Sequence, residues 1–304
     1  MVLMKTTKKR ILFADAALIV TAAIWGVNIF VVKDILGTID PFALIAQRFL
    51  VAALLIGMYL AFARRLVFRQ PLHSLGLGLL LWLVYIFQMY GIRYATPVNA
   101  VFIDELIIFF TPMFYFLFWG KRSSWLTWGS AGVAMIGFYC LIGGIGSVSL
   151  GDLLIVAATI VQSMYLILAS GYMDKKSDPV SSCFLQFAVV GFLSLAVALF
   201  RGTPLEIPGL RSLWIVVFLI LFPTLFAFLA QLSAQKYLSP VKAAMLLSIA
   251  PVFTLLVSAV MGNGNFSMIR ILGIVLILGA VVVSSLPQLE PKETASLKIH
   301  KRTA

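Results

Sequence analysis

Long apolar runs separated by short polar segments repeat along the whole chain. A helix needs about 20 predominantly apolar residues to cross a bilayer, and ten runs approach that length. They are approximately Ile11–Val32, Pro41–Ala63, Leu75–Tyr94, Val98–Trp119, Leu126–Ile142, Asp152–Tyr172, Val180–Phe200, Leu213–Leu232, Val241–Met261 and Ile269–Leu286. The third and fourth runs almost touch, and we expect Pro97 to enforce a tight break between them because proline does not easily continue a helix. The pattern predicts an all-α integral membrane protein of ten transmembrane helices.

Composition leads to the same class of protein. Hydrophobic residues make up 62% of the 304 residues and charged residues 11%, whereas soluble domains have about 45–50% and about 25%. A soluble fold of this composition would keep too little polar surface to face water. The two cysteines, Cys140 and Cys183, lie in apolar runs, so we predict no disulfide framework, no thiolate metal site and no cofactor.

The net charge of +12 is distributed by loop rather than by surface patch. If the N-terminus is cytoplasmic, 17 of the 23 lysines and arginines fall in cytoplasmic segments, five fall outside, and Arg48 lies within a span. Such a bias sets the orientation of membrane proteins. We therefore predict a multi-pass protein of the cell (inner) membrane with both termini in the cytoplasm. No continuous basic face is present, so nucleic acid is not an expected partner.

The two halves of the chain resemble each other. The segment Gln88–Val98 aligns with Gln231–Val241, sharing glutamine, a basic residue, tyrosine, a hydroxyl residue, proline and valine in order. An Asp-Pro pair opens a span at positions 40–41 and again at 178–179. Five spans in each half would start the second half on the opposite side of the membrane, giving inverted repeats. The predicted organisation is a cytoplasmic tail over 1–10, a first repeat over 11–142, a linker over 143–150, a second repeat over 151–286 and a cytoplasmic tail over 287–304.

At this point the chain resembles a known family, the EamA type of the drug/metabolite transporter superfamily. The motifs that carry the resemblance are Trp25-Gly26-Val27-Asn28, Pro41 with Arg48-Phe49, Gly91-Ile92-Arg93-Tyr94-Ala95, Gly151-Asp152-Leu153-Leu154, Tyr237-Leu238-Ser239-Pro240, and Gly273 with Gly279. The resemblance implies ten spans in two repeats and export of amino acids or related metabolites, although some relatives import. The adjacent acids Asp104 and Glu105 are not part of the usual family pattern.

Asp104 and Glu105 are the sharpest chemical signal, because charged residues within a span usually line a cavity or pair with one another. Arg48 should lie at the same depth, since it follows Pro41 by as many positions as Asp104 follows Pro97. We expect Arg48 to pair with one carboxylate while the other faces the cavity, because neighbouring helical positions point about 100° apart. The free carboxylate would bind a substrate ammonium group or accept a proton. A purely structural ion pair is the alternative.

Uncharged polar and aromatic residues form a second candidate set for the solute site. Trp82, Tyr85 and Gln88 share one side of the third span, and Phe102 lies beside the two acids. The other members are Trp25, Asn28, Gln162, Tyr165 and Gln231. Such a lining suits a small amphipathic solute, because aromatic faces attract cations. Aromatic packing and hydrogen bonds between helices are the alternative interpretation.

Pro112 and Pro251 occupy equivalent places in the fourth and ninth spans. Proline removes a backbone hydrogen bond and kinks a helix. We interpret these positions as hinges for alternating access, with static kinks as the alternative.

Taken together, these features predict a secondary transporter that moves a small organic solute, an amino acid or a related amine-bearing metabolite, through a central cavity. No phosphate-binding loop is present, so ATP is not expected to drive it. The sequence leaves open whether transport is coupled to a proton or another ion or proceeds by facilitated exchange. The expected assembly is a monomer or homodimer in the lipid bilayer. The alternative function is a membrane-embedded enzyme acting on lipid-linked substrates, which would use the two carboxylates as acid and base.

Overall fold

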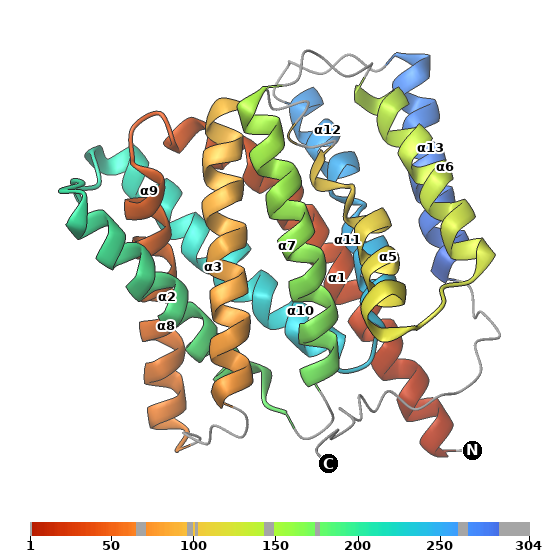
Figure 1. Ribbon diagram of the computed structural model, residues 1–304, viewed down its shortest axis with the longest axis horizontal. Coiled ribbons are helices and arrows are strands. Elements are labelled where there is room, and N and C mark those ends of the chain that lie inside the picture. Colours follow the sequence, from red (N-terminus) through yellow and green to blue (C-terminus); the bar gives the residue numbers. More distant parts are fainter. Residues whose placement is uncertain are drawn as a thin grey trace.

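A computed structural model describes residues 2–64, 71–95, 100, 103–142, 149–173, 177–260 and 267–285. These residues form a helical bundle and contain no β-strand (Figure 1). The elements are α1 (Val2–Ile35), α2 (Pro41–Phe62), α3 (Pro71–Tyr94), α5 (Ile107–Trp119), α6 (Trp125–Ile142), α7 (Leu150–Tyr172), α8 (Pro179–Phe200), α9 (Gly209–Leu219), the π-helix η1 (Ile220–Phe226), α10 (Ala227–Gln235), α11 (Pro240–Leu247), α12 (Ala250–Val260) and α13 (Met268–Ser285).

The number of membrane crossings agrees with the sequence pattern. Seven continuous helical stretches are long and apolar enough to cross a membrane, with α9, η1 and α10 together forming one of them and α11 with the start of α12 another. The shorter helices α5, α6 and α13 bring the described crossings to ten. α1 already begins at Val2, within the segment predicted as an N-terminal tail.

Local sequence signals explain where several helices begin. Asp40 and Asp178 are the N-caps of α2 and α8, and each carboxylate accepts backbone N–H groups just after the proline that opens the helix. Ser149 and Asp152 form a reciprocal capping box at the start of α7. These caps satisfy backbone donors that have no partner within the helix. The Asp-Pro pairs read from the sequence therefore mark equivalent helix starts in the two halves.

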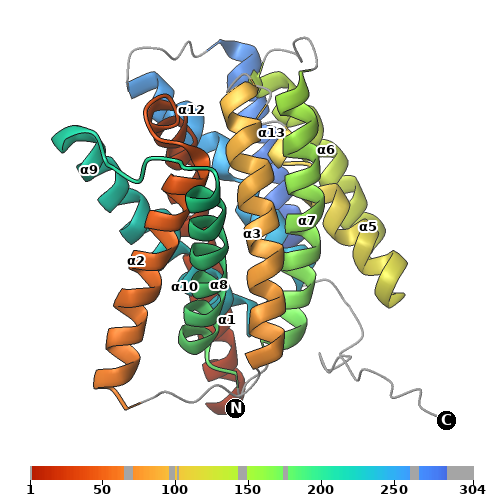
Figure 2. The same ribbon diagram turned by 60° about the vertical axis from the view of Figure 1, so that its left-hand side comes forward.

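The two halves run in opposite directions. Figure 1 shows α1 starting at the lower edge of the bundle, whereas α7, the first helix of the second half, starts at the upper edge. Equivalent helices also make equivalent contacts: α2 packs along α8 and α6 along α13, while the pair α3–α7 is matched by the pair α10–α1. Figure 2 shows α3 and α7 side by side along the length of the bundle. This arrangement is the inverted repeat that the internal sequence similarity predicted.

Glycine allows the closest of these contacts. A Cβ added to Gly151 in α7 would lie 2.2 Å from the backbone nitrogen of Ala95, and one added to Gly26 in α1 would lie 2.4 Å from the carbonyl oxygen of Ala250. Small residues let helix backbones approach closely in membranes, where packing rather than the hydrophobic effect drives helix association. The contacts α3–α7 and α1–α12 therefore depend on residues without side chains.

Three of the crossings are not regular α-helices. In the fourth span a turn at Glu105–Leu106 interrupts the helix, and in the ninth span a turn at Ser248–Ile249 separates α11 from α12. Each turn begins eight positions after a proline of the sequence, Pro97 or Pro240. In the eighth span the π-helix η1 replaces about two turns of α-helix. Irregular backbone at membrane depth is tolerated where it is buried in protein or lines a cavity.

The two prolines interpreted as hinges lie differently relative to these breaks. α5 continues as an α-helix through Pro112, and the break in the fourth span lies seven residues earlier at Glu105. Pro251 is the second residue of α12, directly after the break at Ser248–Ile249. The missing N–H of Pro251 is harmless there, because N–H groups in the first turn have no acceptor within the helix.

Candidate solute-binding site

A pocket lies between the two halves of the bundle, and both halves line it. We call it the central pocket. Its lining residues are Trp25, Asn28, Ile29, Leu81, Val84, Tyr85, Gln88, Ile92, Asp104, Glu105, Ile107, Gln162, Tyr165, Phe228, Gln231, Leu247, Ala250, Pro251 and Thr254. They come from α1, α3, α7, α10, α11, α12 and the fourth span around its break. The lining reaches Ile92, two residues before α3 ends, so the pocket extends towards the end of the bundle opposite the start of α1.

Asp104 and Glu105 both line the central pocket. The expectation that one helix could not direct two adjacent carboxylates to one cavity is therefore wrong. It assumed a continuous helix, whereas the helix ends at Asp104 and the chain turns at Glu105–Leu106 before α5 begins. The turn changes the direction of the backbone between the two residues. Both carboxylates also lie close to the N-terminus of α5, where the helix dipole favours negative charge.

The two carboxylates differ in how far the protein satisfies them. The side-chain nitrogen Nε2 of Gln88 donates to Oδ2 of Asp104 at 3.4 Å, while Oδ1 of Asp104 is buried without a hydrogen-bond partner. Glu105 is 6% exposed, and no described residue pairs with its carboxylate. Buried charges are normally paired, because removing them from water is costly. The pocket therefore holds two acidic groups that the described protein does not neutralise.

Arg48 does not neutralise them, so the predicted ion pair is wrong. The guanidinium is fully buried, and its Nε and Nη2 donate to Oγ1 of Thr224 at 3.2 Å and 3.0 Å. It also lies over the ring of Tyr85, 5.3 Å from the ring centroid. Two ion pairs among the described residues, Arg211–Asp34 and Lys242–Asp15, do not involve Arg48. Arg48 does not reach the acids, because it faces the π-helix of the eighth span.

Thr224 links Arg48 to the irregular backbone of η1. Its Oγ1 donates to the carbonyl oxygen of Leu219 at 2.7 Å while accepting from the guanidinium. The carbonyl of Leu219 lies four residues before Pro223, and proline cannot supply the usual helical donor to that position. Nε1 of Trp25 donates to the carbonyl oxygen of Pro223 at 3.1 Å. Arg48 and Trp25 thus both stabilise the π-helix that precedes Phe228 and Gln231 in the pocket wall.

Several hydrogen-bond donors of the pocket are already used within the protein. The hydroxyl of Tyr165 donates to Oε1 of Gln186 at 2.8 Å. The hydroxyl of Thr254 is within 2.9 Å of the carbonyl oxygen of Gly26, and the indole nitrogen of Trp25 is bonded to Pro223. By contrast, the buried side-chain oxygens of Asn28, Gln162 and Gln231 have no hydrogen-bond partner. Unpartnered buried polar atoms in a pocket indicate groups that a ligand can satisfy.

Most of the residues selected from the sequence lie together in this pocket. Those that do so are Trp25, Asn28, Tyr85, Gln88, Asp104, Glu105, Gln162, Tyr165, Gln231 and Pro251. Trp82 does not line it, because its ring turns to α8 and Nε1 donates to Oγ of Ser194 at 3.1 Å. Phe102 lies outside the described residues, and Pro112 is buried within α5, away from the pocket lining.

Phe228 and Thr254 are two of the nine lining residues that sequence reasoning missed. The ring of Phe228 packs against Trp25, with centroids 5.5 Å apart, and Thr254 adds a hydroxyl. Both could have been found from spacing, because each lies three positions from a selected residue, Gln231 or Pro251, and positions three apart share a helix face. Among the described residues, no group of three His, Cys, Asp or Glu side chains could hold a metal ion.

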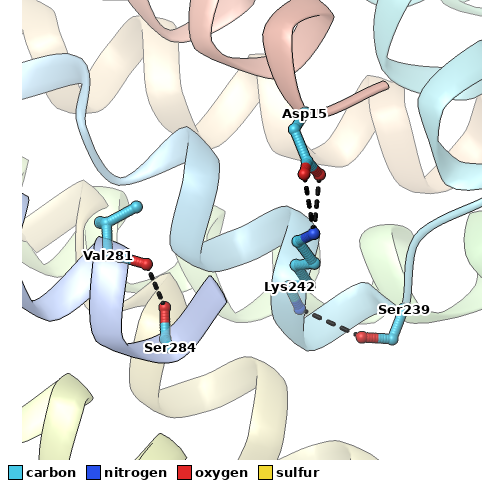
Figure 3. A network of polar contacts seen from close by, with 5 residues as sticks. All are labelled: Asp15, Ser239, Lys242, Val281 and Ser284. Carbon is cyan, nitrogen blue, oxygen red and sulfur yellow. Dashed lines mark hydrogen bonds and ion pairs between the residues drawn. The ribbon is translucent and has the colours of Figure 1, made fainter. Parts of the chain in front are cut away.

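The halves are also joined at the opposite end of the bundle. Figure 3 shows the ammonium group of Lys242, at the start of α11, between the two carboxylate oxygens of Asp15 in α1, at 2.9 Å. Both side chains are only about one fifth exposed, at 23% and 21%. The backbone nitrogen of Lys242 donates to Oγ of Ser239, the N-cap of α11. This ion pair therefore connects α1 to a well-anchored helix of the other half.

Comparison with known proteins assigns this chain to a family. The sequence profile of the EamA-like transporter family matches twice, over residues 12–143 and 149–286, and these two matches span nearly the whole chain. This chain belongs to the EamA-like transporter family. An uncharacterized transporter of Archaeoglobus fulgidus is 30% identical over 275 residues, which cover 90% of this chain and 86% of that protein. A solved crystal structure matches with a TM-score of 0.74 at 21% identity, covering 90% of this chain and 96% of the other, and it supports the fold alone.

The two matches of the EamA profile correspond to the two halves of the chain. Each match contains one set of five crossings, and the central pocket takes its walls from both. This EamA-like transporter is accordingly a multi-pass membrane protein whose candidate site lies between its two repeats.

Proposed function

We propose that this EamA-like transporter is a secondary transporter for a small organic solute that carries an ammonium group, an amino acid or a related amine-bearing metabolite. The observation that carries the proposal is that Asp104 and Glu105 face one pocket without a neutralising cation among the described residues. An ammonium group would supply both the missing charge and three hydrogen-bond donors. The aromatic rings of Trp25, Tyr85 and Phe228 would contact the rest of the solute.

Alternating access would move the solute past the inverted repeats. In this proposal the ion pair between Asp15 and Lys242 closes the bundle at the end where α1 begins, and the central pocket communicates with the other end. The helix breaks at Glu105–Leu106 and Ser248–Ile249 would act as the hinges, since each lies beside the pocket and interrupts a helix at an equivalent place. Hinges are a few residues that absorb backbone rotation.

The charge bias of the loops supports an inner-membrane location with both termini in the cytoplasm. Export is the direction that the family resemblance favours. Cells that express the transporter would then resist a toxic analogue of the solute, whereas an importer would make the same cells more sensitive. A monomer or homodimer is the assembly we propose.

Substitution of the two acids tests the function. Glu105→Gln and Asp104→Asn should each reduce transport of radiolabelled solute into proteoliposomes at least tenfold, because each removes a charge while keeping the side-chain size. Glu206→Gln is the matched control, since Glu206 is an exposed acid in the loop between α8 and α9. Full transport by both pocket variants would refute the proposal.

A further inference from the structure

The charge of the central pocket is one-sided. Within the part of the chain that the structure describes, its lining contains two carboxylates and no lysine, arginine or histidine. Among the described residues, the nearby cations Arg48 and Lys33 lie outside this lining and bond mainly to other protein groups, although Nη1 of Arg48 is buried without a hydrogen-bond partner. The guanidinium of Arg48 donates to Thr224, and Nζ of Lys33 donates to the carbonyl oxygens of Ile92, Arg93 and Ala95 at 2.6, 3.1 and 3.0 Å. Lys33 therefore caps the end of α3 and does not face the solute.

Most of the hydrogen-bond donors of the pocket are also used within the protein, which leaves mainly acceptors for a ligand. Trp25, Tyr165 and Thr254 donate to acceptors of the protein, and Nε2 of Gln88 donates to Asp104. The amides of Asn28, Gln162 and Gln231 can present either an oxygen or a nitrogen to a ligand. The carboxylates of Asp104 and Glu105, when ionised, can only accept hydrogen bonds. These two carboxylates therefore accept hydrogen bonds from a ligand and repel negative charge.

A solute carboxylate has no counterpart in this arrangement. In a zwitterionic α-amino acid the carboxylate is bonded directly to the carbon that bears the ammonium group, so it would enter the pocket together with that group. It would then lie near Asp104 or Glu105, with neutral amides and the hydroxyl of Tyr85 as its available side-chain donors. Like charges in a site of low dielectric constant repel strongly, and burial of an unpaired carboxylate is costly.

We propose that the central pocket selects organic cations that have an ammonium group and an apolar or aromatic body but no carboxylate. This inference rests on the proposed function and narrows its substrate class from amino acids and related metabolites to amines, amino-acid esters and amides. The body of the solute lies against Trp25, Tyr85 and Phe228, which adds a cation–π attraction that a neutral or anionic solute lacks.

Binding of matched probes to the purified full-length transporter in nanodiscs tests the inference by titration calorimetry. The probes are phenylalanine, its methyl ester, phenethylamine and N-acetylphenylalanine, with leucine and its methyl ester as an aliphatic pair. Each ester should bind at least tenfold more tightly than its parent amino acid, and phenethylamine should bind as tightly as the aromatic ester. N-acetylphenylalanine, an anion, should bind most weakly.

Variants separate this inference from the proposed function. Glu105→Gln and Asp104→Asn should each weaken binding of the esters at least tenfold, while Asp34→Asn, which removes an exposed carboxylate outside the pocket, should leave it unchanged. Thermal unfolding checks that each variant is folded, and two acids are tested so that loss of one variant does not end the experiment. If the amino acids bind as tightly as their esters and still depend on the acids, the further inference fails and the proposed function stands. If no amine binds, or binding ignores both acids, the proposed function fails with it.

Discussion

Alanine at Gly151 is expected to separate α3 from α7, the two helices that bring Gln88 and Gln162 to the central pocket. The added Cβ would lie 2.2 Å from the nitrogen of Ala95, 2.6 Å from the carbonyl carbon of Tyr94 and 2.8 Å from the carbonyl oxygen of Gly91. All three are backbone atoms, which cannot rotate away as a side chain can. Ordinary contact begins near 3.4 Å, so the nearest distance is 1.2 Å too short.

The free energy of unfolding should fall by about 2 kcal/mol. Overpacking at a close contact typically costs about 1–3 kcal/mol, and a clash with backbone belongs at the upper end of that range. Alanine recovers up to about 1 kcal/mol because it is a better helix former than glycine. Gly76→Ala, in α3, is the matched control, because a Cβ at Gly76 would meet no atom within 4 Å. That variant should be neutral or slightly more stable.

Thermal unfolding of the two variants in the same detergent measures the difference. A loss of about 2 kcal/mol should lower the apparent Tm by roughly 4–8 °C, while Gly76→Ala should not lower it. Equal melting of Gly151→Ala and the parent protein would show that the backbones of α3 and α7 are not in close contact, and the packing argument would then be wrong.

Three further predictions concern the polar contacts and the hinge. Thr224→Val should destabilise the protein by about 2 kcal/mol, because the buried Arg48 loses its acceptor. Thr224→Ser, which keeps the hydroxyl, should have the melting temperature of the parent protein. An unchanged melting temperature in Thr224→Val would contradict the contact between Arg48 and Thr224. A double-mutant cycle of Asp15→Asn and Lys242→Gln should give a coupling of about 1 kcal/mol in thermal unfolding, since the pair is partly buried; strictly additive effects would exclude the pair. Pro251→Ala should slow transport, because it releases the backbone φ angle that the proline ring fixes beside the helix break, and an unchanged transport rate would argue against a hinge there.

Much of the candidate site could be selected from the sequence because polar residues within apolar runs are conspicuous. Gln88, Gln162, Gln231 and the two acids stand out for this reason, and a polar group in lipid must find a polar partner or a cavity. Trp82 was selected by the same reasoning and yet contacts Ser194 of α8. Helical spacing groups side chains on a face but does not say which neighbouring helix that face meets.

The sequence by itself determined the crossings, several of the helix starts and the inverted halves, because bilayer thickness fixes the length of a span and the Asp-Pro signals act within one turn. Only the tertiary structure decided that the fourth span breaks at Glu105, so that two adjacent acids share one pocket. It also decided that Arg48 bonds to Thr224, 176 positions away along the chain, rather than to an acid at its own depth. Those outcomes depend on how distant helices pack and where backbone hydrogen bonds find partners, which no local pattern of apolar and polar residues records.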